Sequence, residues 1–377
     1  MDDRVVVMAA RTFLAGGSPY ADKRFLYFPS SVLLAVPQTG LPDPLLSWLV
    51  PAVTALMVLA GWLLAVRIFG VPLRSRLAAA GVLLISFLEP FRNLVQLGNW
   101  TACSALALPA ALLLARRSHW GWAGLVVGLA IAGKPMLVPL TLLFLFARQL
   151  RAFLLAVVVP VLAAVLAADL MPDSRLFFTR TLPFVLHGQD DFARPYDASL
   201  GTLLPRLGVS ERMALGVAGL LAAALVLGAW RRWRLGGDEG LRLVETGAML
   251  MVAALIVNRP SFDHYLLVVL PVLLASTVRP RAAARSPWFW LALLPRFAGF
   301  DLPEFAPAQN WAYPVATLNV TTAAVLLRRA ASHPDTGTDA ADPSGTRLPA
   351  AAGHGLPADG VDGAGGAALV LNRPDRA

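Results

Sequence analysis

Two adjacent carboxylates, Asp2 and Asp3, stand at the start of a chain whose later residues are mostly apolar. The polar stretch that follows them, up to about Ser31, favours a loop at a membrane surface. A carboxylate beside a bilayer is partly desolvated, which raises its pKa toward the range in which it can take a proton from a sugar hydroxyl. We therefore expect Asp2 or Asp3 to act as a general base. The alternative is a solvated, charged N-terminus.

A lysine, Lys134, lies in the sequence GLAIAGKPMLVPL between two apolar half-segments. A single lysine at membrane depth is costly and usually has a partner or an anionic ligand. Pro135 ends the helix beside it and frees backbone groups to line a cavity. These features predict that Lys134 holds a phosphate near the membrane surface. The alternative is a lysine that snorkels from a helix end.

Two further cations are flanked by aromatic residues: Arg180 in FFTRTLP and His264 in NRPSFDHYLL. An arginine can bind a phosphate bidentately, and a histidine can donate a hydrogen bond to a phosphate or to a leaving oxygen. We predict that both belong to the phosphate site. The alternatives are contact with lipid headgroups for Arg180 and a hydrogen bond to Asp263 for His264.

The sequence FLEPFRNLVQLGNW contains a proline and a glycine that interrupt an apolar segment. This pattern indicates a broken helix that exposes polar groups to a cavity. An outer-loop salt bridge between Glu89 and Arg92 is the alternative. No spacing typical of a metal site is present, so we predict no metal. We assign four residues to a substrate groove: Glu89, Arg92, Asn99 and Trp100.

The composition identifies the elements that must position these residues. Of the 377 residues, 57% are hydrophobic and 15% are charged, and the mean hydropathy is +0.64. This excess of apolar residues is too large for a soluble core, so we expect an all-α, polytopic membrane protein. The net charge of +9 comes from short Lys and Arg clusters between apolar segments. That pattern indicates membrane topology, and we predict no nucleic-acid partner.

About eleven apolar segments follow one another, and we expect each to be a transmembrane or re-entrant helix. Arginine clusters occupy every second connection, which places those connections in the cytoplasm by the positive-inside rule. The opposite connections, including 1–44 and 171–212, then face the extracytoplasmic side of the plasma membrane together with the candidate site. The apolar segments are 45–66, 77–90, 100–115, 120–133, 135–147, 152–170, 213–230, 243–258, 262–278, 287–299 and 311–327.

The chain divides into a membrane domain, expected at residues 1–330, and a tail. The tail is rich in Gly, Ala, Pro and Asp and has too little large apolar content to pack. We therefore predict that residues 331–377 form a disordered cytoplasmic tail.

Three sequence features carry a family resemblance. The opening segment ends in a (Y/F)xP element at Tyr27, Phe28 and Pro29, the run from LGNW to GKPMLVPL follows, and FFTRTLP comes later. Together they resemble family 87 of the polyprenyl-phosphate-dependent glycosyltransferases, in the GT-C superfamily, over roughly residues 1–330. FFTRTLP is similar to the arabinofuranosyl-transferring members, whereas NRPSFDHY is closer to the mannosyl-transferring members, which carry S-x-x-H there. In the family a helix precedes the opening Asp, so we expect that first helix to be missing here.

The resemblance implies an inverting GT-C enzyme. An Asp of the first outer loop, here Asp2 or Asp3, would deprotonate an acceptor hydroxyl, which would attack the anomeric carbon of a sugar on a polyprenyl phosphate. Nearby cations would stabilise the leaving phosphate, and the candidates are Lys134, Arg180 and His264.

The resemblance also implies the partners. A decaprenyl- or polyprenyl-phosphate sugar would be the donor, with no other cofactor, in contact with membrane lipid. A cell-envelope glycan or glycolipid would be the acceptor. Arabinofuranose is the favoured sugar and mannose is the alternative. A lipid-linked-sugar transporter without chemistry stays open, because broken helices and buried cations suit one equally well.

Overall fold

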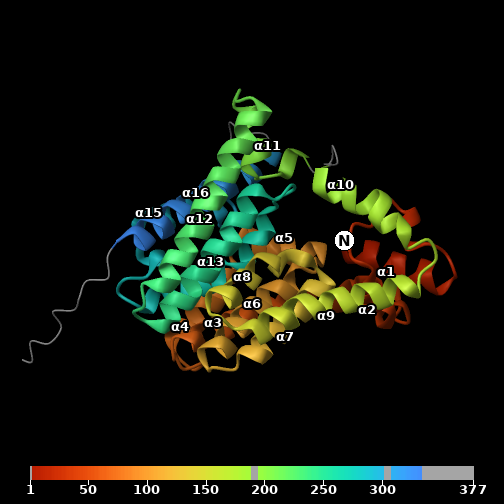
Figure 1. Cartoon of the computed structure of the whole chain (residues 1–377), viewed down its shortest axis with the longest axis horizontal. Helices are drawn as coiled ribbons and strands as arrows, with labels where there is room; N and C mark the ends of the chain where they lie inside the picture. Colours follow the sequence, from red (N-terminus) through yellow and green to blue (C-terminus); the bar gives the residue numbers. More distant parts are fainter. Residues whose placement is uncertain (1, 188–193, 301–306, 333–377) are drawn as a thin grey trace, which may run out of the picture. The chain divides into compact units, whose positions relative to one another are not determined.

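Helices provide the regular structure of the protein in the computed structural model, which describes residues 2–187, 194–300 and 307–332 (Figure 1). Within these residues there is no strand, and a single β-bridge pairs Leu88 with Phe297. The all-α prediction is therefore confirmed for the described part. The predicted tail at 331–377 lies, from residue 333 onward, outside the described residues.

The helices follow one another with short connections. The first half of the chain contains α1 (Asp2–Leu14), η1 (Pro19–Ala21), α2 (Pro29–Thr39), α3 (Asp43–Ile68), α4 (Arg76–Ser86), α5 (Glu89–Leu97), α6 (Thr101–Arg116), α7 (Trp120–Gly133), η2 (Pro135–Leu140), α8 (Thr141–Phe146) and α9 (Leu150–Asp169). The second half contains η3 (Phe177–Thr181), α10 (Leu182–His187), η4 (Arg194–Tyr196), α11 (Leu200–Arg206), α12 (Glu211–Arg234), α13 (Glu239–Val257), η5 (Asp263–Val268), α14 (Leu270–Ala275), η6 (Ser276–Val278), η7 (Ala283–Arg285), α15 (Pro287–Leu293), η8 (Leu294–Arg296) and α16 (Pro307–Ala331).

Four of the described helices are long and apolar enough to cross a membrane: α3, α9, α12 and α13. α9 exposes Val161, Leu162 and Leu166 on its outer face, as expected for a helix that lies against lipid. Each predicted apolar segment coincides with helical structure, but several are short or divided. The predicted number of about eleven spans therefore stays a prediction.

Two predicted helix breaks are confirmed. α7 ends at Gly133, because Lys134 is extended (φ −151°, ψ 124°) and Pro135 begins a separate helical turn. α5 ends at Leu97, because the next residue, Gly98, adopts the left-handed conformation (φ 60°). There a Cβ would also lie 2.5 Å from Cγ1 of Val50, so both backbone conformation and space favour glycine.

Two predicted loops are wrong. Asp2 and Asp3 lie in the first turn of α1, not on a loop. The prediction overlooked that Val6, Ala9 and Ala10 follow helical spacing and are buried on one side. Carboxylates in the first turn of a helix also interact favourably with the helix dipole and so stabilise the helix. The stretch 171–212 likewise contains η3, α10, η4 and α11.

The apolar interior consists of two clusters. The main core draws on the central and C-terminal helices and includes Leu94, Ala102 and Ile131. A separate N-terminal cluster joins α1, η1 and α2 to the end of α9 and to η3. It consists of Val6, Ala9, Ala10, Tyr20, Phe25, Val32, Ala35, Ala167, Met171 and Phe177. The candidate base is therefore carried by a helix that packs in the second cluster.

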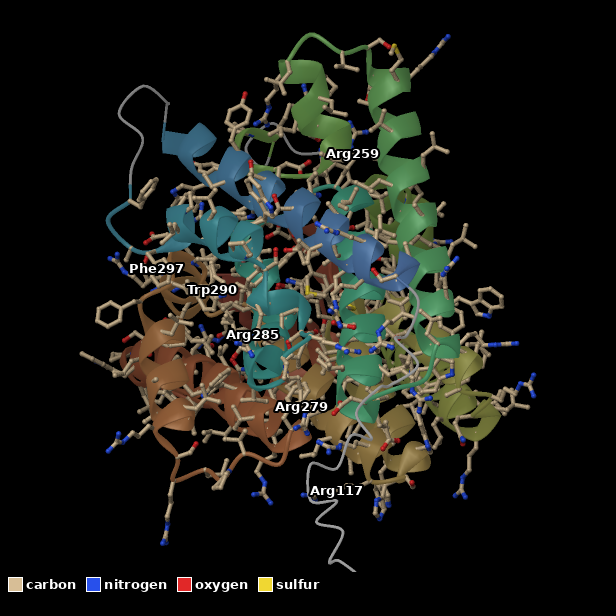
Figure 2. All side chains as sticks on the ribbon, turned by 90° about the vertical axis from the view of Figure 1, so that its left-hand side faces the viewer. Arg117, Arg259, Arg279, Arg285, Trp290 and Phe297 are labelled. Atoms are coloured by element: carbon tan, nitrogen blue, oxygen red, sulfur yellow. The ribbon has the colours of Figure 1, made fainter. Side chains whose placement is uncertain are left out.

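The basic residues are separated along the molecule. Figure 2 shows Arg117 and Arg279 toward its lower end and Arg259 toward its upper end. The sequence predicts that the clusters around Arg117 and Arg279 share one side and that the connection at 259–262 lies on the other. The observed positions agree with this alternation.

Candidate active site

An asparagine connects a candidate base to the partly buried Lys134. Asn99 Nδ2 donates to Oδ2 of Asp2 at 2.5 Å, and Asn99 Oδ1 accepts from Nζ of Lys134 at 2.7 Å. Lys134 Nζ also donates to Oγ1 of Thr101 at 2.8 Å. Thr101 in turn donates to Asn99 Oδ1 through its hydroxyl, at 2.7 Å, and through its backbone N–H, at 2.9 Å. We call Asp2, Asn99, Thr101 and Lys134 the carboxylate–lysine network.

The two helix breaks create this network. The left-handed turn at Gly98 places Asn99 between α5 and α6, and the break after α7 exposes Lys134 to it. The ammonium group of Lys134 is bonded inside the protein, so the snorkelling alternative does not hold. That Lys134 binds a phosphate stays a prediction.

The second carboxylate, Asp3, is only 5% exposed. Its Oδ1 accepts from Nε1 of Trp100 at 3.0 Å. With its amide nitrogen facing Asp3, Gln38 donates to Oδ1 at 3.2 Å and to Oδ2 at 3.0 Å. Burial raises the pKa of Asp3 above its ordinary value, and these hydrogen bonds oppose the rise only in part. Asp3 is thus a fixed, desolvated carboxylate.

Two tyrosines enclose the lysine. Lys134 Nζ lies 4.7 Å from the ring centroid of Tyr265 and 5.9 Å from that of Tyr27. The Tyr27 ring packs edge-on against Trp100, with centroids 6.2 Å apart. Such cation–π contacts stabilise an ammonium group that has left water.

His264 adjoins the same region through Tyr265, with ring centroids 4.8 Å apart. Its backbone N–H donates to Oδ1 of Asp263 at 2.6 Å, and its Nδ1 lies 3.3 Å from the same oxygen, so the hydrogen-bonding alternative is observed. Oδ2 of Asp263 accepts from Asn93 at 2.5 Å and lies 3.9 Å from Arg296. The other ring nitrogen of His264, Nε2, is buried and has no partner in the described part of the chain, so it is available to a ligand.

Three predicted residues lie apart from the network. Arg180, on η3, donates to the carbonyl oxygen of Ala21 at 3.3 Å. Glu89 and Arg92 form the alternative salt bridge at 3.4 Å. They also line a cavity of about 200 Å³ together with Arg296, Phe297 and Trp311. No observed contact joins Glu89 or Arg92 to Asn99 or Trp100 among the described residues.

Several residues at the site were overlooked in the sequence. Thr101, Gln38 and Tyr265 have ordinary neighbours, and only their positions in space reveal their contacts. Arg296 could have been found in the sequence, because it is a lone charge in an apolar segment and such a charge needs a partner. No group of side chains suited to hold a metal ion occurs within the described ranges.

The described residues are helical, and four of their helices are long and apolar enough to cross a membrane, which defines a helical membrane protein. The model of glycosyltransferase family 87 matches residues 25–258. This range is more than half of the chain, so the protein belongs to family 87, as the resemblance predicted. Asn99, Lys134 and Arg180 lie inside the matched range, whereas Asp3 and His264 lie outside it.

Two named relatives have nearly the same sequence identity to this chain. An "Alpha-(1->3)-arabinofuranosyltransferase" of Mycobacterium tuberculosis (strain CDC 1551 / Oshkosh) is 31% identical over 281 residues, which cover 73% of this chain and 63% of the relative. A "Polyprenol-phosphate-mannose-dependent alpha-(1-2)-phosphatidylinositol mannoside mannosyltransferase" of Mycolicibacterium smegmatis is 29% identical over 327 residues, which cover 77% and 72%. The chain spans about 63% of the length of the first relative. No solved structure matches the chain.

Proposed function

We propose that the protein is a membrane glycosyltransferase that transfers a sugar from a polyprenyl-phosphate donor to a cell-envelope glycan or glycolipid. Arabinofuranose is the favoured sugar. One observation carries the proposal: Asp3 is buried, is fixed by Trp100 and Gln38, and adjoins a network that ends on the partly buried ammonium group of Lys134. Membership in family 87 and the names of the relatives support it.

In this reaction Asp3 takes the proton of an acceptor hydroxyl. The hydroxyl oxygen forms a bond to the anomeric carbon while the bond from that carbon to the phosphate oxygen breaks, with inversion. The phosphate leaves with the electron pair. Asp2 is the second candidate base, and its bond to Asn99 also holds the network in place.

The developing charge on the phosphate requires nearby positive groups. Lys134 supplies a partly buried positive charge, and His264 supplies Nε2 as a hydrogen-bonding group. Arg180, on η3, contacts Ala21 of η1 outside the network, so its assignment to the phosphate requires the donor to reach η3. No cofactor beyond the lipid-linked sugar is proposed.

The acceptor and the membrane side follow from other features. The cavity lined by Glu89, Arg92 and Trp311 combines charged and aromatic groups, which suit a sugar. Asn99 and Trp100 hold the carboxylates beside the proposed reaction centre. We place this centre on the extracytoplasmic side of the plasma membrane, because the arginine clusters alternate with the connections that carry it.

Mannose is the second candidate sugar. His264 favours it, because Ser261 and His264 reproduce the S-x-x-H pattern of the mannosyl-transferring members, and one relative is named for mannose transfer. Membranes that contain the full chain would be supplied with each labelled lipid donor and a short arabinoside or mannoside acceptor. Transfer from one donor identifies the sugar, and transfer from neither overturns both candidates.

A further inference from the structure

A buried carboxylate, Asp197, joins two segments that lie far apart in the chain. Asp197 is fully buried. Its Oδ1 accepts from the backbone N–H of Ser199 at 2.8 Å and from that of Ser261 at 2.7 Å. Its Oδ2 accepts from the hydroxyl groups of Ser199, at 2.9 Å, and of Thr202, at 2.6 Å. Asp197 thus bonds the start of α11 to the segment that follows α13.

Further contacts hold the same two segments together. The backbone N–H of Ala198 donates to the carbonyl oxygen of Ser261 at 2.8 Å, and Arg259 donates to the carbonyl oxygen of Gly201 at 3.0 Å. The backbone N–H and the carbonyl oxygen of Ser261 are therefore both bonded to the segment that carries Asp197. Because Ser261 is fully buried, breaking these bonds would leave backbone groups without a partner, which is costly. The backbone of Ser261 is thus firmly held.

The segment that Asp197 holds leads directly to His264. Only Phe262 and Asp263 separate Ser261 from His264. The ring of Phe262 stacks on the imidazole of His264, with centroids 5.6 Å apart and planes inclined by 14°. A displacement of Ser261 would therefore shift Phe262 and, with it, the imidazole.

Two polar atoms of this segment are buried without a partner. Oγ of Ser261 and Nε2 of His264 make no hydrogen bond in the part of the chain that the structure describes, and His264 is only 2% exposed. A buried polar group without a hydrogen bond is costly, so two such atoms three residues apart indicate a place where a ligand binds. Their positions depend on the contacts of the segment that carries them.

We propose that Asp197 is a positioning residue of the transfer reaction, because it fixes the segment 261–264 and so holds Nε2 of His264 toward the ligand. The inference rests on the proposed function, in which His264 contacts the donor phosphate. The two bonded segments belong to the connections 171–212 and 259–262, which the arginine clusters place on the same side of the membrane. Asp197 itself takes no part in the bond changes and acts only through His264.

The first test measures the reactivity of His264 and needs no transfer. Purified full-length protein would be treated with diethyl pyrocarbonate, which modifies accessible histidines, and the modified peptides would be quantified by mass spectrometry. The buried His264 should react slowly in the wild type, and the exposed His119 serves as an internal reference. Asp197→Ala should raise the rate at His264 about tenfold relative to His119, because the segment opens more often. An unchanged ratio would overturn the proposal.

Matched variants separate the Asp197 contacts from a general loosening of the protein. Asp197→Asn should react nearly as the wild type does, because the amide oxygen can accept from both backbone N–H groups and the amide nitrogen can donate to both hydroxyl groups. Thr202→Val removes one of these hydroxyl groups. It should give a smaller rise at His264, and it tests the proposal in place of Asp197→Ala if that variant does not fold.

The control removes a carboxylate at the other end of α13. Asp238 caps the start of that helix and accepts from the backbone N–H of Leu241 at 2.8 Å. Asp238→Ala should lower the unfolding temperature but leave the reactivity of His264 unchanged. A rise at His264 equal to that in Asp197→Ala would contradict the proposal.

A double-mutant cycle tests whether Asp197 acts through His264. Alone, Asp197→Ala should lower the transfer rate by roughly ten- to a hundredfold, as a small misplacement of a contacting group does. In a His264→Gln background it should lower the remaining rate by less than about twofold, because the group that it positions is gone. Losses that multiply would show that Asp197 supports only the fold and would overturn the positioning role.

The two readouts separate this inference from the proposed function. Faster modification of His264 in Asp197→Ala, together with no transfer of either sugar by the wild type, would support the hold on His264 and reject the function. Transfer by the wild type that persists unchanged in Asp197→Ala would keep the function and reject the positioning role.

Discussion

At the residue scale, the two aspartates have different environments although they are neighbours. Asp2 is bonded to Asn99 and through it to Lys134, whereas Asp3 is buried between Trp100 and Gln38 and lines a groove between α1 and the start of α3. The sequence predicted a desolvated carboxylate and a lysine with a partner. It could not predict Asn99 as that partner, because contacts between residues this distant in the chain depend on how the helices pack.

Asp3 should contribute more to transfer than Asp2. Asp3→Asn keeps the size of the side chain but removes the base, so the transfer rate should fall by roughly 10²- to 10⁴-fold. Asp2→Asn should cause a smaller loss, since it keeps a polar partner for Asn99. Initial rates with the labelled donor measure both effects. Unchanged turnover in both variants would refute the assignment of the base.

The pH dependence should report the same residue. Burial raises the pKa of Asp3, and the base acts only when it is deprotonated. The transfer rate should therefore fall with decreasing pH at a higher pH than an ordinary carboxyl group would cause. Rates measured from roughly pH 4 to pH 8 give this acid limb. If the residual activity of the Asp3→Asn variant still falls at the same pH, a group other than Asp3 causes the fall.

At the element scale, hydropathy predicted where helices occur better than how long they are. The break at Lys134 was visible because Pro135 follows it, and the break at Gly98 because glycine interrupts an apolar run. α1 was missed because its acidic and basic residues hide a short apolar stripe. Backbone geometry also explains why small residues recur between helices. At Gly124 of α7, a Cβ would fall on the backbone of Ala152 in α9.

Gly124→Ala should therefore destabilise the protein by about 1–3 kcal/mol, the typical cost of overpacking. It should also lower transfer, because α7 positions Lys134 at its end. Gly219→Ala is the matched control: a Cβ there meets nothing within 4 Å, so stability should stay the same or rise slightly. Thermal unfolding in detergent compares the two variants. Equal unfolding temperatures would show that α7 and α9 adapt to the added methyl group.

At the scale of the whole molecule, the arginine clusters predict which connections share a side, and the structure agrees with that grouping. A buried carboxylate helps to hold the basic end together. Glu245 of α13 accepts from Arg232 of α12 at 2.6 Å and from Arg329 of α16 at 2.5 Å. The sequence could not reveal this pairing, because the three residues lie on three separate helices.

Chemical labelling of intact cells should confirm the two sides. Cys103 is the single cysteine, so Cys103→Ser gives a background without thiols. In that background, a membrane-impermeant maleimide should label Arg212→Cys but not Ser118→Cys, both of which replace exposed residues. Permeabilised cells should label both. The opposite pattern would place the proposed reaction centre in the cytoplasm.

The division of the interior into two apolar clusters has a consequence for how the protein loses activity. The candidate base is attached to the N-terminal cluster and Lys134 to the main core, so the site exists only while the two clusters are docked. Local opening costs less free energy than global unfolding. Mild denaturant should therefore abolish transfer while circular dichroism still reports nearly full helix content. The transfer rate would then report the contact between the two clusters, whereas the helix content would report the helices within each cluster.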